Sequence, residues 1–317
     1  MKEKTILDAF LFSFNVIFPI FLVMALGYFL RKINIINAKF IEIGTKLTFT
    51  VAIPCMVFAN LINADINETF DLSLTIFAVI ATLITFIILR LIVPKYIKDA
   101  ASWSAYIQGA FRSNYLIIGF ALLAAIGGPA ALTKGAMLFV FVGPLYNILS
   151  VLVLASANRD EAGKSIMRSI YTNPVILSTT LAIILALASI KLPNSINFAV
   201  DMLGKMALPL SLLTLGGTIS FHHDYTSMPQ VITASLIKVL LIPLLCLPIA
   251  YALGFEGIDL IICMVLFATP SAISCFPMAY QMGADYRLTG MIVAVTNTFA
   301  IITLFIFIYV LRVVELV

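Results

Sequence analysis

The chain has 317 residues, of which 62% are hydrophobic and only 11% are charged, with a formal net charge of +4. A soluble domain carries about 25% charged residues, so a water-soluble fold could not cover this much apolar surface. The basic residues form no stripe that could follow a phosphate backbone, which excludes nucleic-acid binding. The composition indicates an all-α polytopic membrane protein whose surroundings are the lipid bilayer.

In chain order, ten runs reach the roughly 20 apolar residues that a spanning helix needs. We number the predicted helices one to ten. Helices one to five are 8–30, 40–62, 70–93, 103–126 and 130–155. Helices six to ten are 170–190, 197–220, 230–253, 257–282 and 286–312. The first run is too long for a signal peptide's hydrophobic region, so it is predicted to remain as a span.

Lysine and arginine in the connections predict the orientation, because these residues concentrate on the cytoplasmic side. Ten spans place both termini on one side, which carries the smaller basic set: Lys2, Lys4, Lys134, Lys191 and Arg312. The larger set is Arg31, Lys32, Lys39, Arg90, Lys95, Lys98, Arg159, Lys164, Arg168 and Arg287. We therefore predict a multi-pass protein of the cell membrane with both termini extracytoplasmic.

Helices four and nine resemble each other. The stretch FRSNYLIIGFALLAAIGGPAALT, which begins at Phe111, aligns without a gap with FATPSAISCFPMAYQMGADYRLT, which begins at Phe267. In this alignment Gly127 also meets Gly283. The offset is five helices, an odd number, so equivalent helices would cross the membrane in opposite directions. This pattern predicts an inverted-topology repeat, which many secondary transporters share.

The predicted organisation follows from this repeat. Residues 1–155 form the first five-helix repeat, 156–169 form a cytoplasmic linker, and 170–317 form the second repeat. Both fourth helices of these repeats contain polar or helix-breaking residues in an apolar run, so helices four and nine are expected to be broken and to cross near the midplane. The expected helix-breaking residues are Gly119, Pro270 and Pro277, with Asn114 contributing.

A broken helix exposes the N–H groups of its second half, and two such ends at the midplane would form a receptor for an anion. The predicted substrate-binding residues are Arg112, Ser113, Asn114, Thr269, Pro270, Ser271 and Ser274. Packing is the alternative for the prolines and hydroxyls. For Arg112 the alternative is a position closer to the cytoplasmic surface.

Lys238 lies inside helix eight and is the candidate for coupling. It either carries a fixed positive charge where another transporter would bind Na⁺, takes part in proton coupling, or extends to the membrane interface. No cofactor is expected, because the chain contains no nucleotide-binding or HExxH motif. His222, His223 and Asp224 are expected in a solvated loop rather than a metal site, and the absence of a plausible catalytic set argues against an enzyme.

FRSNYLIIGFALL, NPVILSTTLAIIL, KVLLIP and ATPSAISCFPMAYQMGADYRLTGMIVAVTN together resemble the auxin efflux carrier family, which includes the plant PIN proteins and many bacterial permeases. The chain lacks the long loop of the plant members, as compact bacterial members do. The resemblance implies two inverted five-helix repeats. It also implies a scaffold of helices one, two, six and seven, and a transport domain of helices three to five and eight to ten. Ala121 stands where related sequences often have proline, so the first break is expected to be gentler than the second.

The resemblance implies elevator-type transport of small organic anions, namely mono- or dicarboxylates or auxin-like acids. The coupling ion stays open between Na⁺, H⁺ and none, as does homodimerisation through the scaffold helices. Two alternatives remain: a sodium-coupled bile-acid-type symporter of the same fold, and a non-transporting membrane receptor or enzyme.

Overall fold

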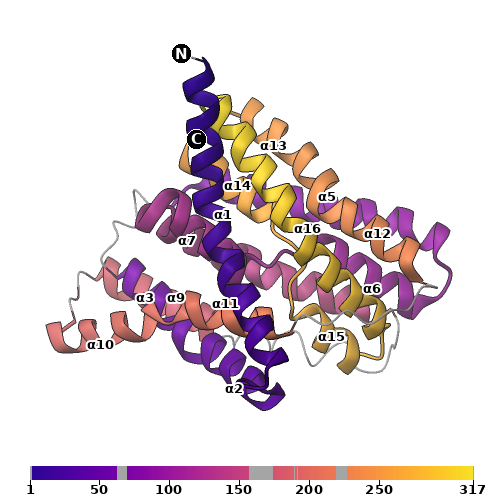
Figure 1. Ribbon diagram of the computed structural model, residues 1–317, viewed down its shortest axis with the longest axis horizontal. Coiled ribbons are helices and arrows are strands. Elements are labelled where there is room, and N and C mark those ends of the chain that lie inside the picture. The colour runs from indigo at the N-terminus through magenta and orange to yellow at the C-terminus, as the bar shows by residue number, and fades with distance from the viewer. Residues whose placement is uncertain are drawn as a thin grey trace.

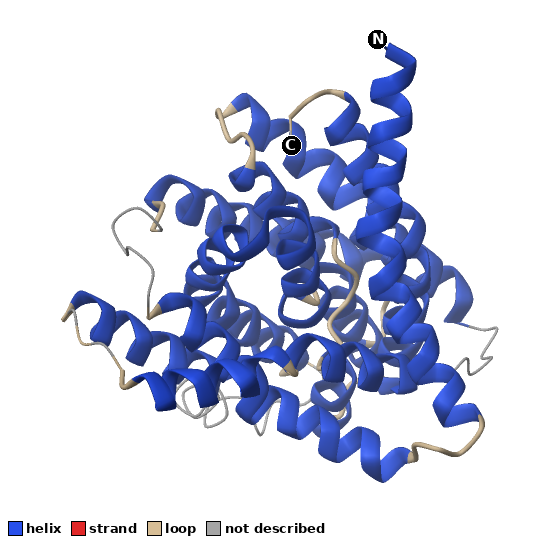
Figure 2. Cartoon of the chain, turned by 60° about the vertical axis from the view of Figure 1, so that its left-hand side comes forward, coloured by secondary structure: helices blue, strands red, loops and turns tan. Residues whose placement is uncertain are grey.

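The computed structural model describes residues 2–62, 70–156, 174–188, 190, 192–218 and 227–316, and every regular element in these ranges is a helix (Figure 2). The first half forms α1 (Lys2–Lys32), α2 (Ala38–Leu47), η1 (Thr48–Ala52), α3 (Ile53–Leu61), α5 (Leu72–Tyr96), α6 (Ala100–Phe111), η2 (Tyr115–Gly119) and α7 (Phe120–Leu154). The second half forms α9 (Pro174–Leu187), α10 (Asn194–Lys205), α11 (Ala207–Thr218), α12 (Met228–Leu236), η4 (Ile237–Leu241), α13 (Ile242–Ala252), α14 (Ile258–Ala268), α15 (Cys275–Gln281) and α16 (Tyr286–Val313). The predicted all-α class is confirmed. Most of the predicted linker, together with His222, His223 and Asp224, lies outside the described residues.

Seven helical stretches of the described chain are long and apolar enough to cross a membrane, so the protein is multi-pass. Ten were predicted, and the difference arises in three places. Helices four and five share the stretch Tyr115–Leu154, where Gly128 makes a kink with a φ of 61° that favours glycine. Predicted helix six, Pro174–Leu187, and the first half of predicted helix nine, Ile258–Ala268, are shorter apolar helices.

Predicted helices four and nine are both interrupted within the apolar part of the chain. The first interruption, 112–114, separates α6 from the π-helical turn η2. The second interruption, 269–274, separates α14 from α15. The first interruption is the shorter of the two.

The helices fall into two packing groups. α1, α2, α3, α9, α10 and α11 make their most extensive contacts mainly with one another, and in Figure 1 the last five lie together at the lower left. α5, α6 and α12 to α16 pack together on the other side, and α7 contacts both groups. Both ends of the chain lie at the same end of the molecule (Figure 1), where the Arg312 guanidinium lies 4.6 Å from the Phe12 ring centre.

The backbones of α1 and α11 touch directly. A Cβ added at Gly216 would lie 1.8 Å from the carbonyl oxygen of Met24, and one added at Gly27 would lie 2.0 Å from the carbonyl oxygen of Leu213. Small residues at such contacts let membrane helices approach closely. The first packing group is therefore built around a contact that leaves no room for a side chain.

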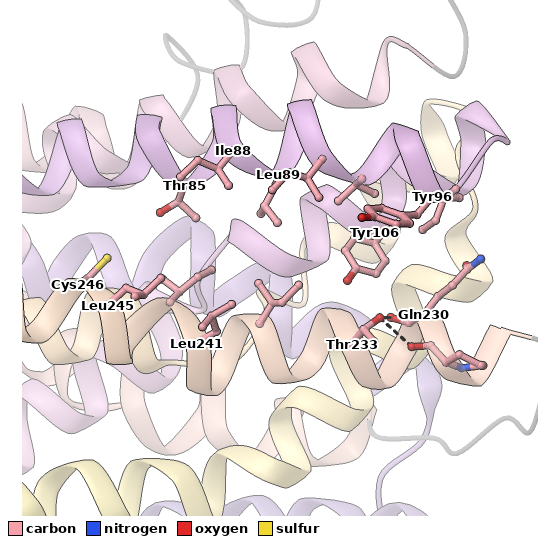
Figure 3. A pocket seen from close by; sticks show the side chains of 16 residues that line it. Thr85, Ile88, Leu89, Tyr96, Tyr106, Gln230, Thr233, Leu241, Leu245 and Cys246 are labelled. Carbon is pink, nitrogen blue, oxygen red and sulfur yellow. Dashed lines mark hydrogen bonds between the residues drawn. The ribbon is translucent and has the colours of Figure 1, made fainter.

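An apolar groove of about 570 Å³ runs between α5, α6 and the helix formed by α12, η4 and α13 (Figure 3). Its few polar lining groups are neutral and include Thr85, Tyr106, Gln230 and Thr233. The lining contains no charged side chain and no residue of either interruption. This groove is therefore a poor candidate for binding an anion.

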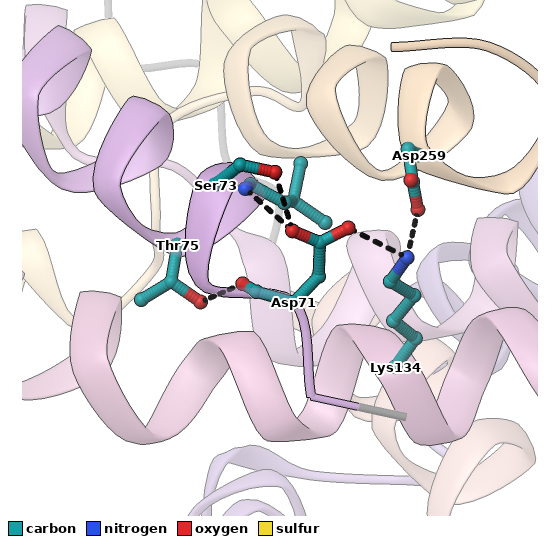
Figure 4. A network of polar contacts seen from close by, with 6 residues as sticks. Asp71, Ser73, Thr75, Lys134 and Asp259 are labelled. Carbon is teal, nitrogen blue, oxygen red and sulfur yellow. Dashed lines mark hydrogen bonds and ion pairs between the residues drawn. The ribbon is translucent and has the colours of Figure 1, made fainter. Parts of the chain in front are cut away.

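Ion pairs of Lys134 connect the starts of α5 and α14 (Figure 4). Lys134 Nζ lies 3.2 Å from a carboxylate oxygen of Asp71 and also forms an ion pair with Asp259. Asp71 precedes α5 and Asp259 lies in the first turn of α14, so these helices begin at the same end. α5 leads to the start of α6, where Ser102 donates to Asp285 across 3.1 Å. α6 and α14 therefore approach the interruptions from opposite ends of the molecule.

The hydrogen bonds around Asp71 shift its protonation. Burial raises its pKa, but this effect is outweighed by hydrogen bonds from the Leu74 N–H, the Ser73 hydroxyl and Lys134, which together lower the pKa to about 2. The carboxylate is thus charged throughout the physiological pH range and caps the start of α5.

Candidate functional site

The two interruptions pair with each other through their backbones. The Asn114 N–H donates to the Pro270 carbonyl across 2.7 Å, and the Ala272 N–H donates to the Arg112 carbonyl across 3.1 Å. These bonds form an isolated antiparallel bridge between segments that are far apart in the sequence. Unpaired backbone groups are costly in hydrocarbon, and this pairing satisfies four of them.

The bridge changes one expectation. Both broken helices were expected to offer free N–H groups to a ligand, but the N–H groups of Asn114 and Ala272 are engaged across the bridge. The physical reason is that a neighbouring carbonyl is a better partner than lipid for a donor at this depth. These two N–H groups are therefore not available to a ligand.

Lys238 contacts the first interruption and the end of α14. Its ammonium is fully buried and donates to the Ser113 hydroxyl across 2.6 Å and to the Phe267 carbonyl across 2.9 Å. The Ser113 hydroxyl donates in turn to the Leu266 carbonyl and accepts from the Tyr146 hydroxyl across 3.3 Å. This burial excludes the alternative that Lys238 extends to the membrane interface.

Arg112 is held by neutral groups. One guanidinium nitrogen donates to the Asn147 side-chain oxygen across 2.7 Å. Another donates to the Ser150 hydroxyl across 3.0 Å and contacts the Met278 sulfur at 2.9 Å. The ion pairs found in the described chain include neither Arg112 nor Lys238. Two cations thus flank the first interruption without a carboxylate partner in that part of the chain.

Ser271 anchors the second interruption. Its hydroxyl donates to the Gly109 carbonyl across 2.5 Å, and its N–H donates to the Thr296 hydroxyl oxygen across 3.2 Å. The Asn297 amide reaches the Ser271 carbonyl at 3.4 Å. α16 therefore supports the second interruption from the side.

Each of three amide side chains near the bridge has one buried polar atom without a hydrogen-bond partner. These atoms are Gln108 Oε1, Asn114 Nδ2 and Asn297 Oδ1. The residues are 0%, 4% and 2% exposed. Buried polar atoms in native proteins almost always have partners, so unpaired atoms in one region suggest a ligand that would complete them.

The remaining predicted binding residues contribute less. The Thr269 hydroxyl donates to the Val265 carbonyl within its own helix across 2.8 Å. Ser274 is half-buried just before α15 and makes no capping hydrogen bond with its side chain. The interruptions therefore bring together Arg112, Ser113, Pro270 and Ser271 with Asn114, whereas Thr269 is engaged locally.

Two of the predicted helix-breaking residues lie inside helices. Gly119 ends the turn η2, and a Cβ there would approach Val265 at 3.1 Å, so this glycine allows close packing against α14. Pro277 lies in the first turn of α15, where the backbone N–H of any residue has no acceptor within the helix, so proline is tolerated there. The interruption itself lies at Pro270 in the second half and at 112–114 in the first.

Several residues of the site were not identified from the sequence. They are Gln108, Tyr146, Asn147, Ser150, Thr296 and Asn297. Each is a polar side chain in an otherwise apolar helix, and this signal marks functional positions in membrane proteins.

Comparison with known proteins identifies the family. A family model described as membrane transport protein matches residues 12–165 and 155–308, which is nearly the whole chain. The chain belongs to this family, the auxin efflux carriers. The resemblance to the auxin efflux carrier family, noted in the sequence, is thereby confirmed.

Three relatives match over nearly their full length. An uncharacterized transporter of Methanothermobacter thermautotrophicus is 23% identical and aligns over 93% of this chain and 97% of its own. The uncharacterized transporter YfdV of Escherichia coli K12 is 24% identical, over 94% and 97%. A Rhizobium meliloti protein named "Putative malonate transporter" is 22% identical, over 94% and 95%. The family and these relatives identify a membrane transporter rather than an enzyme.

Proposed function

We propose that this protein is a secondary transporter of small organic anions, with mono- and dicarboxylates as substrates, and that the anion binds beside the bridge between the two interruptions. The observation that carries the proposal is the presence of two cations, Arg112 and Lys238, whose described contacts are all neutral. Removing a charge from water costs several kcal/mol unless a partner compensates it. A bound carboxylate would supply that compensation.

The unpaired amide atoms support the same position. Asn114 Nδ2 is a donor and suits a carboxylate oxygen, whereas Gln108 Oε1 and Asn297 Oδ1 are acceptors and suit a hydroxyl or a protonated acid. The name of the R. meliloti relative suggests malonate as the first compound to test. Malonate carries two carboxylates, so it could balance both cations.

The proposed mechanism is an elevator movement. α5 to α7 and α12 to α16 would form the transport domain, and the group that contains α1 and α11 would form the scaffold, since each group packs mainly within itself. The ten helices would form two inverted repeats, and the approach of α6 and α14 to the bridge from opposite ends supports this proposal. The sequence separation between Thr82 and Lys238 equals that between Phe111 and Phe267, so Thr82 and Lys238 would occupy equivalent positions in the two repeats. Thr82 and Lys238 are both buried. Extracytoplasmic termini remain a prediction.

The test is counterflow of labelled malonate in proteoliposomes. Asn114→Ala is expected to lose most of the exchange, because it removes the unpaired donor without changing a described side-chain hydrogen bond. Asn197→Ala is the matched control, since Asn197 lies on α10 in the other packing group, and it should keep wild-type exchange. Counterflow that is absent from the wild type with every mono- and dicarboxylate tried would refute the proposed substrate class.

A further inference from the structure

We infer that Lys238 is a built-in cation: its ammonium fills an oxygen site at the end of α14 that would otherwise attract Na⁺, so that transport needs no Na⁺. The consequence for transport rests on the proposed function, but the oxygen site itself can be tested without any substrate.

The oxygen site arises from the second interruption, atom by atom. In a continuous helix the N–H of residue 270 would bond the Leu266 carbonyl, and that of residue 271 would bond the Phe267 carbonyl. Pro270 has no N–H, and the Ser271 N–H donates to the Thr296 hydroxyl instead. Two carbonyls are thus released at the same end of α14.

The released carbonyls are satisfied by the first interruption and by helix eight. The Leu266 carbonyl accepts from the Ser113 hydroxyl, and the Phe267 carbonyl accepts from Lys238 Nζ across 2.9 Å. Lys238 Nζ also donates to Ser113 Oγ across 2.6 Å. Every described contact of this nitrogen is therefore an oxygen acceptor.

This arrangement is suited to a small cation. Released carbonyls and the C-terminal ends of half-helices coordinate Na⁺ in transporters with broken helices, and the helix dipole makes that end electronegative. The titratable neighbours of Lys238, namely Tyr146, Cys246 and Cys275, are neutral near pH 7 in their ordinary range. A second cation could not bind beside the ammonium, because like charges at such distances repel strongly.

The position of the charge has a functional consequence. Ser113 joins Lys238 to the bridge, and Asn114 of the same interruption bonds Pro270. The ammonium would therefore travel with the anion site through the whole cycle. A Na⁺ that fulfilled this role would have to bind and dissociate in every cycle, and transport would then follow the Na⁺ gradient.

The test compares two replacements of Lys238. Lys238→Ser removes the ammonium and leaves space and a hydroxyl beside the oxygens, whereas Lys238→Met removes the charge but keeps the site filled. Thermal unfolding of purified protein is measured without any carboxylate, with Na⁺ or with N-methylglucamine at equal ionic strength. Lys205→Ser is the matched control, because Lys205 is exposed and pairs with Asp201 at 2.5 Å.

We expect Na⁺ to raise the unfolding temperature of Lys238→Ser and to leave the wild type, Lys238→Met and Lys205→Ser unchanged. A folded Lys238→Ser that shows no response to Na⁺ would overturn the inference. Because this readout involves no anion, it is independent of the proposed substrate.

Wild-type transport gives a second measurement that remains valid if the Lys238 variants do not fold. Malonate counterflow should be equal in Na⁺ medium and in Na⁺-free medium. A wild-type protein that is stabilised by Na⁺, or that exchanges malonate only with Na⁺, would also overturn the inference. If the wild type exchanges no carboxylate under any condition, the proposed function fails, while the unfolding result for Lys238→Ser still decides the nature of the oxygen site.

Discussion

Replacement of Arg112 by methionine is expected to separate binding from stability. The side chain of methionine fills part of the same volume next to Met278 but removes the guanidinium. A hydrogen bond to a charged group contributes about 1.5–3 kcal/mol, and about 1.4 kcal/mol corresponds to a tenfold change in Kd. We therefore expect Arg112→Met to weaken malonate binding by roughly 10- to 100-fold.

Stability should respond differently from binding in the same variant. The change leaves the Asn147 side-chain oxygen without the donor that now lies 2.7 Å away, which costs about 1–3 kcal/mol when the oxygen stays dry. It also removes a charge that has no carboxylate among its described contacts, and the desolvation of such a charge costs several kcal/mol. The two effects oppose each other, so the unfolding temperature without ligand should stay level or rise.

The assay is a thermal-unfolding titration with malonate, followed by counterflow in proteoliposomes. Arg90→Met is the matched control, because Arg90 is exposed and its guanidinium stacks 4.4 Å from the Trp103 ring centre, away from both interruptions. The control should keep wild-type affinity. A folded Arg112→Met protein that binds malonate as tightly as the wild type would show that this arginine supports only the structure, and the charge argument for the site would then fail.

Two further predictions concern stability. Gly216→Ala should lower the unfolding temperature, because the added Cβ would lie 1.8 Å from the Met24 carbonyl oxygen and overpacking costs about 1–3 kcal/mol. Gly290→Ala is the control, because its Cβ would approach only a side chain, at 3.2 Å. Equal unfolding temperatures for the two variants would contradict the close α1–α11 contact. The pKa of Asp71, lowered from 3.8 to about 2, predicts a contribution to stability that is complete above about pH 5 and is lost progressively as the pH falls towards 2. Unfolding temperatures measured across this range should fall less steeply for Asp71→Asn, and parallel curves would refute the assignment.

The sequence predicted the interruptions because their causes are local. Proline at position 270 removes a donor whatever surrounds it, and an arginine, a serine and an asparagine in succession are costly in lipid. The expectation that helices four and nine meet came from the repeat, and the structure pairs their interruptions directly. Local chemistry and internal similarity were thus sufficient for the centre of the fold.

The partners of the site could not be predicted, because they depend on how distant helices face each other. Nothing in the sequence around Asn147 or Ser150 indicates that these side chains reach Arg112. The misassigned breaks have a similar cause. Gly119 and Pro277 have the residue types of helix breakers, but one provides space for a neighbouring helix and the other occupies a first turn that tolerates proline.

The bridge between the interruptions also constrains how the protein is made. Arg112 and Asn114 are synthesised long before Pro270 and Ala272, which supply their backbone partners. During insertion, the backbone N–H and carbonyl groups of the first interruption therefore have no hydrogen-bond partners until the second half of the polypeptide is inserted. An N-terminal fragment that stops before α14 should therefore be a substrate for membrane quality control, and co-expression of the missing half should rescue it.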